Sequence, residues 1–519
     1  MLTTSGIPLI ARALEPERQN RTAIVDTEGS YTYRALLESS ERAARRLIQA
    51  AATVQAISND LSEMRVAFMV PSGFSHVAIQ WGIWRAGGIA VPLCLTHPRP
   101  ELEHVIRDSG AAILIAHPDF ELPKAIARDL GLVFLSTTEA LNGQESGQER
   151  TRPSLPDVTE DRGALILYTS GTTSKPKGVL TTHRNIAAQV ESLITAWEWS
   201  KDDAILHFLP LHHIHGVINV LTCALWAGAS VRFLPRFDAD VVWQALIDED
   251  FTLFMAVPTI YAKLIAAWDQ ADPERRAEMS AACRKLRLMV SGSAALPVST
   301  LETWRTISGH TLLERYGMTE IGMAISNPLH GERRPGSVGT PLPGVRVFLA
   351  DESGNPAPPG APGEIYVKGP GVFREYWGNP KATADAFRDG WFRTGDVAAL
   401  EDGYYRILGR ASVDIIKTGG YKVSALEIEE VLRTHPAVAE CAVVGTPDPE
   451  WGERVSAAVI LKAGNTLTLD ALRAWAKERM AVYKVPTRLQ IVDDLPRNAM
   501  GKVTKPEVAA SFAQSPTSA

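Results

Sequence analysis

Cysteine is scarce in this sequence. The chain of 519 residues contains four: Cys94, Cys223, Cys283 and Cys441. They lie far apart and form no Cys-x-x-Cys pair, so neither a disulfide framework nor a structural zinc site is expected. We interpret them as small buried side chains in a protein of a reducing compartment.

The sequence also lacks an excess of charge of either sign. Its 53 basic and 59 acidic residues sum to a net charge of −6. This balance argues against nucleic acid or a membrane surface as the main partner. The hydrophobic fraction of 45%, the 39 glycines and the 33 prolines are ordinary, which excludes collagen, coiled coil and wholesale disorder. We therefore expect a soluble, mixed α/β chain of the size of an enzyme.

Long hydrophobic runs are missing as well. The longest uncharged stretch, 204–231, holds Pro210 and several histidines in its first half, which leaves too few apolar residues to span a membrane. We predict a strand, a loop and a buried helix there. The N-terminal segment MLTTSGIPLIARALEPER has no secretory apolar core, and Glu15 and Glu17 make it a poor transit peptide. These features predict a cytoplasmic protein.

The pattern of apolar residues predicts an α/β fold. Up to Pro92 the signals alternate between strands (Thr22–Val25, Arg65–Val70, Ile89–Pro92) and helices (Tyr33–Ala52, Ser75–Ala86). Such alternation is typical of a sheet covered by helices on its faces. A strand, a glycine loop and a helix follow at 164–197, and short strands and turns at 341–409 indicate a β-rich subdomain. We predict a large N-terminal domain, 1–409, of layered α/β subdomains plus this β-rich subdomain, and a small α+β C-terminal domain, 410–519.

The strongest local signal is the segment LILYTSGTTSKPKG, residues 165–178. An apolar strand leads into hydroxyl side chains around Gly171, followed by Lys175, Lys177 and a second glycine. Hydroxyls, unhindered backbone N–H groups and ammonium groups are what polyphosphate oxygens require. The segment is not a Walker A loop, because Lys177 precedes its glycine. A polar surface turn is the plainer alternative, and the nearby lysines favour a phosphate loop.

Residues 168–180 resemble the signature of the adenylate-forming superfamily, which includes acyl-CoA synthetases, luciferases and the adenylation domains of peptide synthetases. Further motifs of that superfamily follow in order: LPLHHIHG (209–216), RYGMTE (315–320), WFRTGD (391–396), Gly409-Arg410, KTGGYK (417–422) and PRNAMGK (496–502). The resemblance covers nearly the whole chain. It implies a two-step reaction, in which a carboxylate attacks ATP to give an acyl-adenylate and pyrophosphate, and a thiol then displaces AMP. ATP, Mg²⁺ and coenzyme A are implied with it.

The resemblance also implies roles for individual residues. Thr169, Ser170, Gly171, Thr172 and Thr173 would hold the β- and γ-phosphates together with Lys177. Glu320 would bind Mg²⁺ through a hard oxygen ligand, and Thr319 would contact the α-phosphate. The adenine would lie against Tyr316 and the turn Gly292-Ser293-Ala294, within a nucleotide site that also takes in Arg315, Gly317 and Met318. Asp396 would accept hydrogen bonds from the ribose hydroxyls, and Arg410 would reach the ribose or a phosphate.

Three further positions matter for catalysis and motion. His213 matches the motif histidine beside the acyl group, although alone it would be interpreted as a structural histidine. A zinc site in LHHIHG is disfavoured because no carboxylate or cysteine accompanies the histidines. Lys502 would neutralise charge as the adenylate forms, while Gly419 and Gly420 would line the coenzyme A tunnel on the other face of a mobile C-terminal domain. The hinge would be Ser412, where many relatives carry Asp or Lys, and Ser174 replaces a commoner glycine.

The substrate depends on the acyl pocket. Arg287 precedes a strand that leads to the adenine-binding turn, and an arginine there could either face solvent or hold a distant carboxylate. The stretches 287–297, 312–326 and 409–429 closely resemble malonyl-CoA synthetases of the mitochondrial type called acyl-CoA synthetase family member 3. On that resemblance Arg287 would bind the distal carboxylate, and His215, Ser291 and Met318 would shape a small pocket. We predict a malonyl-CoA synthetase that also accepts methylmalonate.

Other readings stay open from the sequence. The chain could be a medium-chain or aromatic acyl-CoA ligase on the same scaffold, which Arg287 and His215 oppose. It could also be a stand-alone adenylation enzyme that loads a carrier protein supplied in trans. We expect a monomer or a weak homodimer, with no nucleic-acid or membrane partner.

Overall fold

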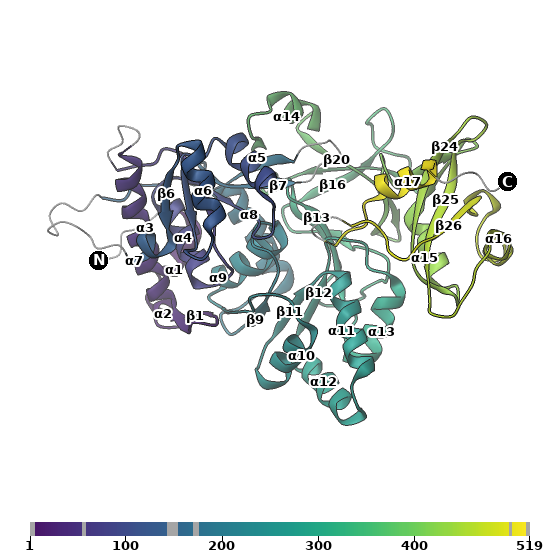
Figure 1. Cartoon of the computed structure of the whole chain (residues 1–519), viewed down its shortest axis with the longest axis horizontal. Coiled ribbons are helices and arrows are strands. Elements are labelled where there is room, and N and C mark those ends of the chain that lie inside the picture. The colour runs from purple at the N-terminus through teal and green to yellow at the C-terminus, as the bar shows by residue number, and fades with distance from the viewer. Residues whose placement is uncertain (1–5, 54–58, 143–153, 170–175, 498–500, 515–519) are drawn as a thin grey trace.

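The computed structural model describes residues 6–53, 59–142, 154–169, 176–497 and 501–514. Within them the chain forms two large sheets, a β-rich subdomain and a smaller C-terminal unit, and the C-terminal unit lies at the opposite end of the long axis from the N-terminal helices (Figure 1). The mixed α/β architecture confirms the predicted fold class.

The first large sheet has seven strands. Their order is β18 (Glu375–Tyr376), β8 (Lys177–Thr182), β7 (Gly163–Thr169), β4 (Ile89–Pro92), β3 (Arg65–Met69), β5 (Ile113–Ala116) and β6 (Val133–Ser136). The strand, loop and helix predicted for 164–197 are present as β7 and α8, and between them lies β8, a strand that the sequence pattern did not predict. That strand turns back antiparallel on β7, with Thr169 opposite Lys177 in the register.

The second large sheet has nine strands. Their order is β15 (Thr340–Pro341), β14 (Gly322–Ser326), β13 (Leu313–Met318), β12 (Leu288–Ser291), β11 (Leu253–Ala256), β9 (Ala204–His207), β10 (Ser230–Phe233), β1 (Thr22–Val25) and β2 (Ser30–Thr32). From β13 to β10 the neighbours are parallel, so their carboxyl ends lie together. We call the end at which β9, β10, β11 and β12 finish the carboxyl edge, and the opposite end the amino edge.

A layer of helices joins the two sheets. Buried side chains of α3 (Tyr33–Ala51), α4 (Phe74–Arg85) and α8 (His183–Trp197) form one hydrophobic core with strands of both sheets. The other helices up to the β-rich subdomain are α1 (Pro8–Ala13), α2 (Pro16–Gln19), α5 (Arg99–Ser109), α6 (Glu121–Leu130), α7 (Thr137–Asn142), α9 (Cys223–Ala227), α10 (Ala239–Asp248), α11 (Pro258–Gln270), α12 (Pro273–Lys285) and α13 (Val298–Ser308). The predicted helices at 33–52 and 75–86 are confirmed to within one residue at each end.

The run 204–231 contains the predicted strand, loop and buried helix. The helix begins as a π-helix, η2 (His215–Thr222), and continues into α9. The Thr222 hydroxyl donates to the Val217 carbonyl, five residues back, at 2.6 Å. A π-helix closes its backbone bonds over five residues instead of four and is often found at functional sites. In the part of the chain that is described, no helix is both long and apolar enough to cross a bilayer.

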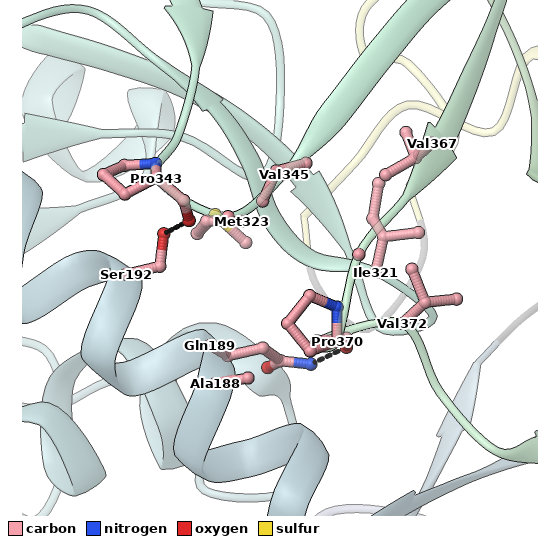
Figure 2. A pocket seen from close by; sticks show the side chains of 13 residues that line it. Ala188, Gln189, Ser192, Ile321, Met323, Pro343, Val345, Val367, Pro370 and Val372 are labelled. Atoms are coloured by element: carbon pink, nitrogen blue, oxygen red, sulfur yellow. Dashed lines mark hydrogen bonds between the residues drawn. The ribbon is translucent and has the colours of Figure 1, made fainter.

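The β-rich subdomain packs on α8. Its strands are β16 (Arg346–Ala350), β17 (Gly363–Lys368), β19 (Phe387–Arg388), β20 (Trp391–Glu401) and β21 (Tyr404–Arg410), with the short helix α14 (Pro380–Ala386). A narrow cavity lies at this seam (Figure 2). Gln189 donates to the Gly371 carbonyl there, and Ser192 donates to the Pro343 carbonyl at 2.8 Å. The remaining lining is mostly apolar, and the cavity contains no titratable side chain, so we treat it as a packing seam.

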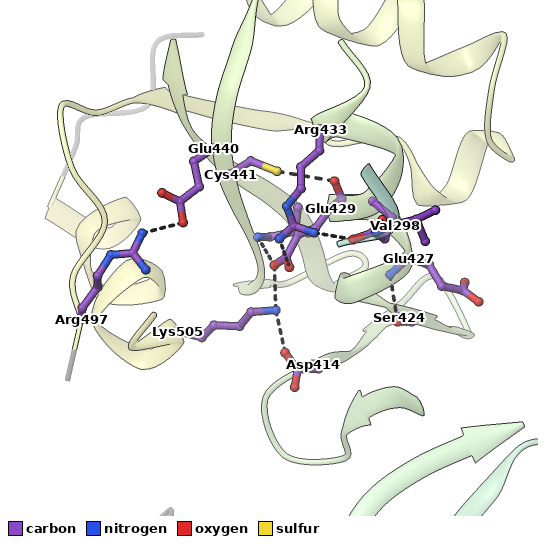
Figure 3. Close-up of polar contacts among 12 residues, drawn as sticks. Val298, Asp414, Ser424, Glu427, Glu429, Arg433, Glu440, Cys441, Arg497 and Lys505 are labelled. Atoms are coloured by element: carbon purple, nitrogen blue, oxygen red, sulfur yellow. Dashed lines mark hydrogen bonds and ion pairs between the residues drawn. The ribbon is translucent and has the colours of Figure 1, made fainter. Parts of the chain in front are cut away.

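The C-terminal unit has a sheet of its own. It comprises β22 (Ile415–Thr418), β23 (Tyr421–Ser424), α15 (Ala425–Arg433), β24 (Val438–Asp448), β25 (Gly452–Leu461), α16 (Leu469–Lys477), the 3₁₀ turn η3 (Val482–Lys484), β26 (Arg488–Ile491) and α17 (Lys505–Gln514). Lys505 lies inside it, 2.6 Å from the Asp414 carboxylate and 2.8 Å from that of Glu429 (Figure 3). This cluster ties the segment after β21 to the core of the small unit.

All four cysteines are buried free thiols, as the sequence predicts. Burial raises the pKa of Cys283 and Cys441 to about 12. Three of the four thiols lie before residue 300 and Cys441 lies in the hydrophobic core of the C-terminal unit.

Candidate active site

The predicted site residues gather around the carboxyl edge. The loop after β9 leads to His213 and then to His215, the first residue of η2. The turn after β12 carries Gly292, Ser293 and Ala294, and His215 Nδ1 lies 3.2 Å from the Ser293 hydroxyl. Parallel strands bring these two loops to one edge, which is where α/β sheets bind ligands.

Close packing explains why Gly292 has no side chain. A Cβ placed there would come within 2.4 Å of the Arg315 guanidinium carbon. Arg315, on β13, is 4% exposed, and burial lowers its pKa to about 10, which still leaves it charged at neutral pH. Its Nε and Nη2 atoms have no hydrogen-bond partner among the described residues. A buried cation with free donors thus supports the turn after β12.

An acidic side chain joins the β-rich subdomain to this edge. Asp396, on β20, accepts a hydrogen bond from the Tyr316 hydroxyl at 2.6 Å and another from Arg410 Nε at 3.0 Å. Burial alone would lower the pKa of Arg410, but the Asp396 carboxylate outweighs it and raises that pKa. Tyr316, Asp396 and Arg410 are therefore brought together as predicted for a ribose and base site.

Glu320 and Lys177 lie on either side of a tyrosine that the sequence analysis missed. The Tyr376 hydroxyl donates to Glu320 Oε1 at 2.9 Å, and Lys177 Nζ lies 5.1 Å from the centre of the Tyr376 ring. Burial raises the pKa of Glu320, and the tyrosine hydrogen bond opposes that rise. Tyr376 is on β18, which pairs with β8 and so brings the two predicted residues near each other. The sequence offered no motif that pointed to Tyr376.

Lys502 reaches the same edge from the C-terminal unit. The surrounding protein shields Lys502 from water and so lowers its pKa. The charges of Arg315 and Arg410 lower this pKa further, whereas the Asp396 carboxylate raises it. Burial and Lys502 together lower the pKa of His213 to about 4, so this imidazole is neutral at pH 7. Burial and Arg315 likewise place the pKa of His215 well below its ordinary value. Two neutral histidines thus face a group of cations.

Some predicted residues lie outside this cluster or outside the described residues. Ser170, Gly171, Thr172 and Thr173 fall in the undescribed segment between Thr169 and Lys177. Thr319 follows β13 beside Glu320, and Gly317 and Met318 end that strand. Gly419 and Gly420 form the turn between β22 and β23 with φ values of 54° and 82°, and a Cβ on Gly419 would lie 2.8 Å from the Trp451 ring. Ser412 is an exposed residue in the turn between β21 and β22.

The structure corrects the role predicted for Arg287. Arg287 lies at the amino edge, just before β12, whereas the site is at the carboxyl edge. Its guanidinium holds Asp203 with two hydrogen bonds of 2.8 and 2.7 Å and donates to the carbonyls of Trp197 and Glu198 at the end of α8. Asp203 is 4% exposed and also accepts from the Thr252 hydroxyl at 2.6 Å. Four hydrogen bonds therefore hold the Arg287 guanidinium in the packing of the amino edge, away from the site.

Arg236 is a cation at the carboxyl edge that the sequence analysis missed. It follows β10, is exposed, and has no hydrogen bond or ion pair to the described residues. The ring of its neighbour Phe237 lies 5.5 Å from that of Phe208, which directly follows β9. The two loops are therefore adjacent. An arginine placed directly after a buried strand was the available signal.

Comparisons with known proteins agree with this arrangement. The family model described as AMP-binding enzyme matches residues 11–377, and that of the AMP-binding enzyme C-terminal domain matches residues 427–502. The mitochondrial malonate–CoA ligase ACSF3 of Xenopus laevis is 46% identical, covering 98% of this chain and 92% of its own length. A feruloyl-CoA synthase of Amycolatopsis is 36% identical over 86% of this chain and 89% of its own. 

A solved structure gives the same result in three dimensions. The crystal structure of ATP-bound MatB from Rhodopseudomonas palustris superposes with a TM-score of 0.87 at 34% identity, covering 98% of this chain and 99% of that one. The two family models together match most of the chain, and the site residues lie within the matched segments or between them. This chain belongs to the AMP-binding, adenylate-forming enzyme family.

Proposed function

We propose that this protein is an ATP-dependent malonate–CoA ligase. In the first step a malonate carboxylate oxygen attacks the α-phosphorus of ATP and releases pyrophosphate; in the second, the thiol of coenzyme A displaces AMP and loses its proton. The observation that carries the proposal is the near full-length similarity to a malonate–CoA ligase. Methylmalonate is proposed as a second substrate.

The site offers the groups that adenylate formation requires. Charge develops on phosphate oxygens as the bond to pyrophosphate breaks, and fixed cations stabilise it. Lys177 would hold the β- and γ-phosphates and Lys502 the oxygens at the reacting phosphorus. Asp396 has lone pairs left for the ribose hydroxyls, because Tyr316 and Arg410 take one hydrogen bond at each of its oxygens. Neutral His213 would position the acyl carboxylate by a hydrogen bond and would form no ion pair with it.

Magnesium fits the donor set at Glu320. Mg²⁺ binds one or two carboxylates together with phosphate oxygens rather than a protein cage. The Oε1 atom of the buried Glu320 carboxylate accepts a hydrogen bond from Tyr376, which leaves Oε2 as the candidate metal ligand. The described residues hold no group of three or more His, Cys, Asp or Glu that could form a protein cage for a metal. Bound there, the ion would neutralise phosphate charge.

We propose Arg236 as the cation for the distal carboxylate in place of Arg287. The order of strands is β12, β11, β9, β10, so the loop that carries Arg236 lies beyond the histidine loop, on the side away from the turn after β12. An acid adenylated near that turn would extend toward Arg236. A planar guanidinium that has no hydrogen bond or ion pair to the described residues is suited to bind a carboxylate through two hydrogen bonds.

A substrate panel tests this proposal. AMP release would be measured with malonate, methylmalonate, acetate, propionate, octanoate and benzoate, for the wild type and for Arg236→Gln and Arg287→Gln. We expect malonate to be preferred and Arg236→Gln to reduce kcat/KM for malonate by about 100-fold, the loss of a charge-assisted bidentate pair. In the same variant, kcat/KM for propionate should change by less than about threefold. Equal losses for all acids, or a malonate-specific loss in Arg287→Gln, would overturn the assignment.

Two alternatives are outcomes of related assays. The similarity to a feruloyl-CoA synthase keeps an aromatic ligase in view, and a preference for benzoate or octanoate would select it. Replacing coenzyme A by a pantetheine-bearing carrier protein tests the loading of a carrier. The domain division at 409/410, the hinge at Ser412, the tunnel at Gly419 and Gly420 and the oligomeric state stay predictions. So does the cytoplasmic compartment, since the name of the Xenopus relative is that of a mitochondrial protein.

A further inference from the structure

Asn219 is the least satisfied buried amide near the proposed acyl site. It is 1% exposed, yet neither its Nδ2 nor its Oδ1 atom has a hydrogen-bond partner among the described residues. Leaving a buried polar group without a partner destabilises the folded state, so such a group in a native protein needs an explanation. A side chain with two unpaired polar atoms at this depth is either a defect in packing or a group kept for a ligand.

The position of Asn219 in its helix indicates the direction in which its side chain points. Asn219 lies in η2, four residues after His215. A π-helix takes roughly four to five residues per turn, so these two side chains lie on nearly the same side of the helix. His215 faces the turn after β12, because its Nδ1 lies 3.2 Å from Ser293 Oγ. Asn219 is therefore one turn deeper on the face that borders the carboxyl edge.

The neighbouring polar atoms are unsatisfied in the same way. His215 Nε2, Ser291 Oγ at the end of β12, and Arg315 Nε and Nη2 all lack partners among the described residues. Each of these residues is at most 5% exposed. Arg315 and His215 are close enough for the guanidinium charge to lower the histidine pKa. Several unpaired donors and acceptors on neighbouring elements indicate a polar site that a ligand would complete.

We propose that Asn219 determines the specificity of the acyl site by donating a hydrogen bond from Nδ2 to the second carboxylate of the acid. The inference rests on the proposed function and deepens it. Arg236 would contact that carboxylate from the loop after β10, and Asn219 from η2. A monocarboxylic acid of similar size, such as propionate, would leave the amide unpaired, and the site would discriminate against it.

The test compares Asn219→Leu with Asn219→Ala and with a matched control, Asn327→Leu. Asn327 is 2% exposed, but its amide donates to the carbonyls of Glu314 and Ser337 and accepts from the Arg334 N–H. The readouts are kcat/KM for malonate and propionate, and the melting temperature without substrate. Asn219→Leu should reduce kcat/KM for malonate by about 10- to 100-fold. The ratio of kcat/KM for malonate to kcat/KM for propionate should fall by a similar factor.

Stability separates a ligand-binding group from a structural one. Removing an amide that has no protein partner should leave the melting temperature of Asn219→Leu unchanged or raise it, whereas Asn327→Leu should lower it. A clear fall in the melting temperature of both Asn219 variants, with an unchanged malonate-to-propionate ratio, would overturn the proposal and indicate a structural or water-bound amide. Wild-type protein without malonate activity would instead refute the proposed function itself.

Discussion

The amino and carboxyl edges of the nine-stranded sheet differ in how far their polar side chains are hydrogen-bonded. At the amino edge, Arg287 and Asp203 satisfy each other through two hydrogen bonds, and Thr252 and the end of α8 take up what remains. At the carboxyl edge, His215, Ser291 and Asn219 are buried and have polar atoms without a hydrogen-bond partner among the described residues. Polar residues that pair with one another stabilise the fold, and we propose that a substrate supplies the missing partners at the carboxyl edge.

The largest effect should come from a lysine at the carboxyl edge. Lys502→Ala should reduce the rate of adenylate formation by about 100-fold or more, because in the proposed mechanism Lys502 is the cation beside the phosphate oxygens that gain charge. Pyrophosphate release in the presence of malonate measures this step. Lys505→Met is the control from three residues away: Lys505 belongs to a closed cluster with Asp414 and Glu429, so its loss should lower the melting temperature. Comparable loss of pyrophosphate release in a folded Lys505 variant would contradict the distinction.

At the amino edge the expected effect is on stability. Arg287→Gln leaves the carboxylate of Asp203, which is 4% exposed, without its main partner. Breaking a buried ion pair costs about 3–5 kcal/mol, and the partly exposed arginine reduces this to about 2–3 kcal/mol. Chemical denaturation would measure the change in the free energy of unfolding. A malonate-to-propionate ratio within about twofold of the wild type is expected in the same variant.

An effect that is smaller per pH unit comes from Glu314, the neighbour of Ser291 in the register of β12 and β13. Burial raises its pKa from 4.5 to about 8; the Gly336 N–H opposes this and Glu430 adds to it. Between those two pKa values the folded state holds a proton that the unfolded state releases. The free energy of unfolding therefore falls as pH rises, by about 1.4 kcal/mol per pH unit from this group.

Glu314→Gln removes that titration. Melting temperatures of the variant and the wild type, measured between pH 5 and pH 8 in steps, should diverge in favour of the variant as the pH rises. Parallel curves would show that Glu314 is ionised throughout this range in the folded protein.

The sequence was informative where local pattern decides structure and where ordered motifs decide chemistry. Helix 33–51 and strand 22–25 follow from periodicity, and Tyr316, Asp396, Arg410 and Lys502 come together as their motifs predict. The missed strand β8 offers only Val179 and Leu180 as an apolar signal, and its pairing with β7 is a property of the sheet. Arg287 was misplaced for a similar reason, since a one-dimensional pattern does not tell which end of a strand faces the ligand.

The buried thiols make opening of the two parts of the chain measurable by chemistry. A thiol reagent modifies a cysteine at a rate set by how often its surroundings open, because the closed form offers neither access nor thiolate. Cys223 and Cys283 are 0% exposed in the large core, and Cys441 is 2% exposed in the core of the C-terminal unit. Labelling kinetics resolved by peptide mass would therefore report separate opening rates for the two parts of one molecule without any introduced probe.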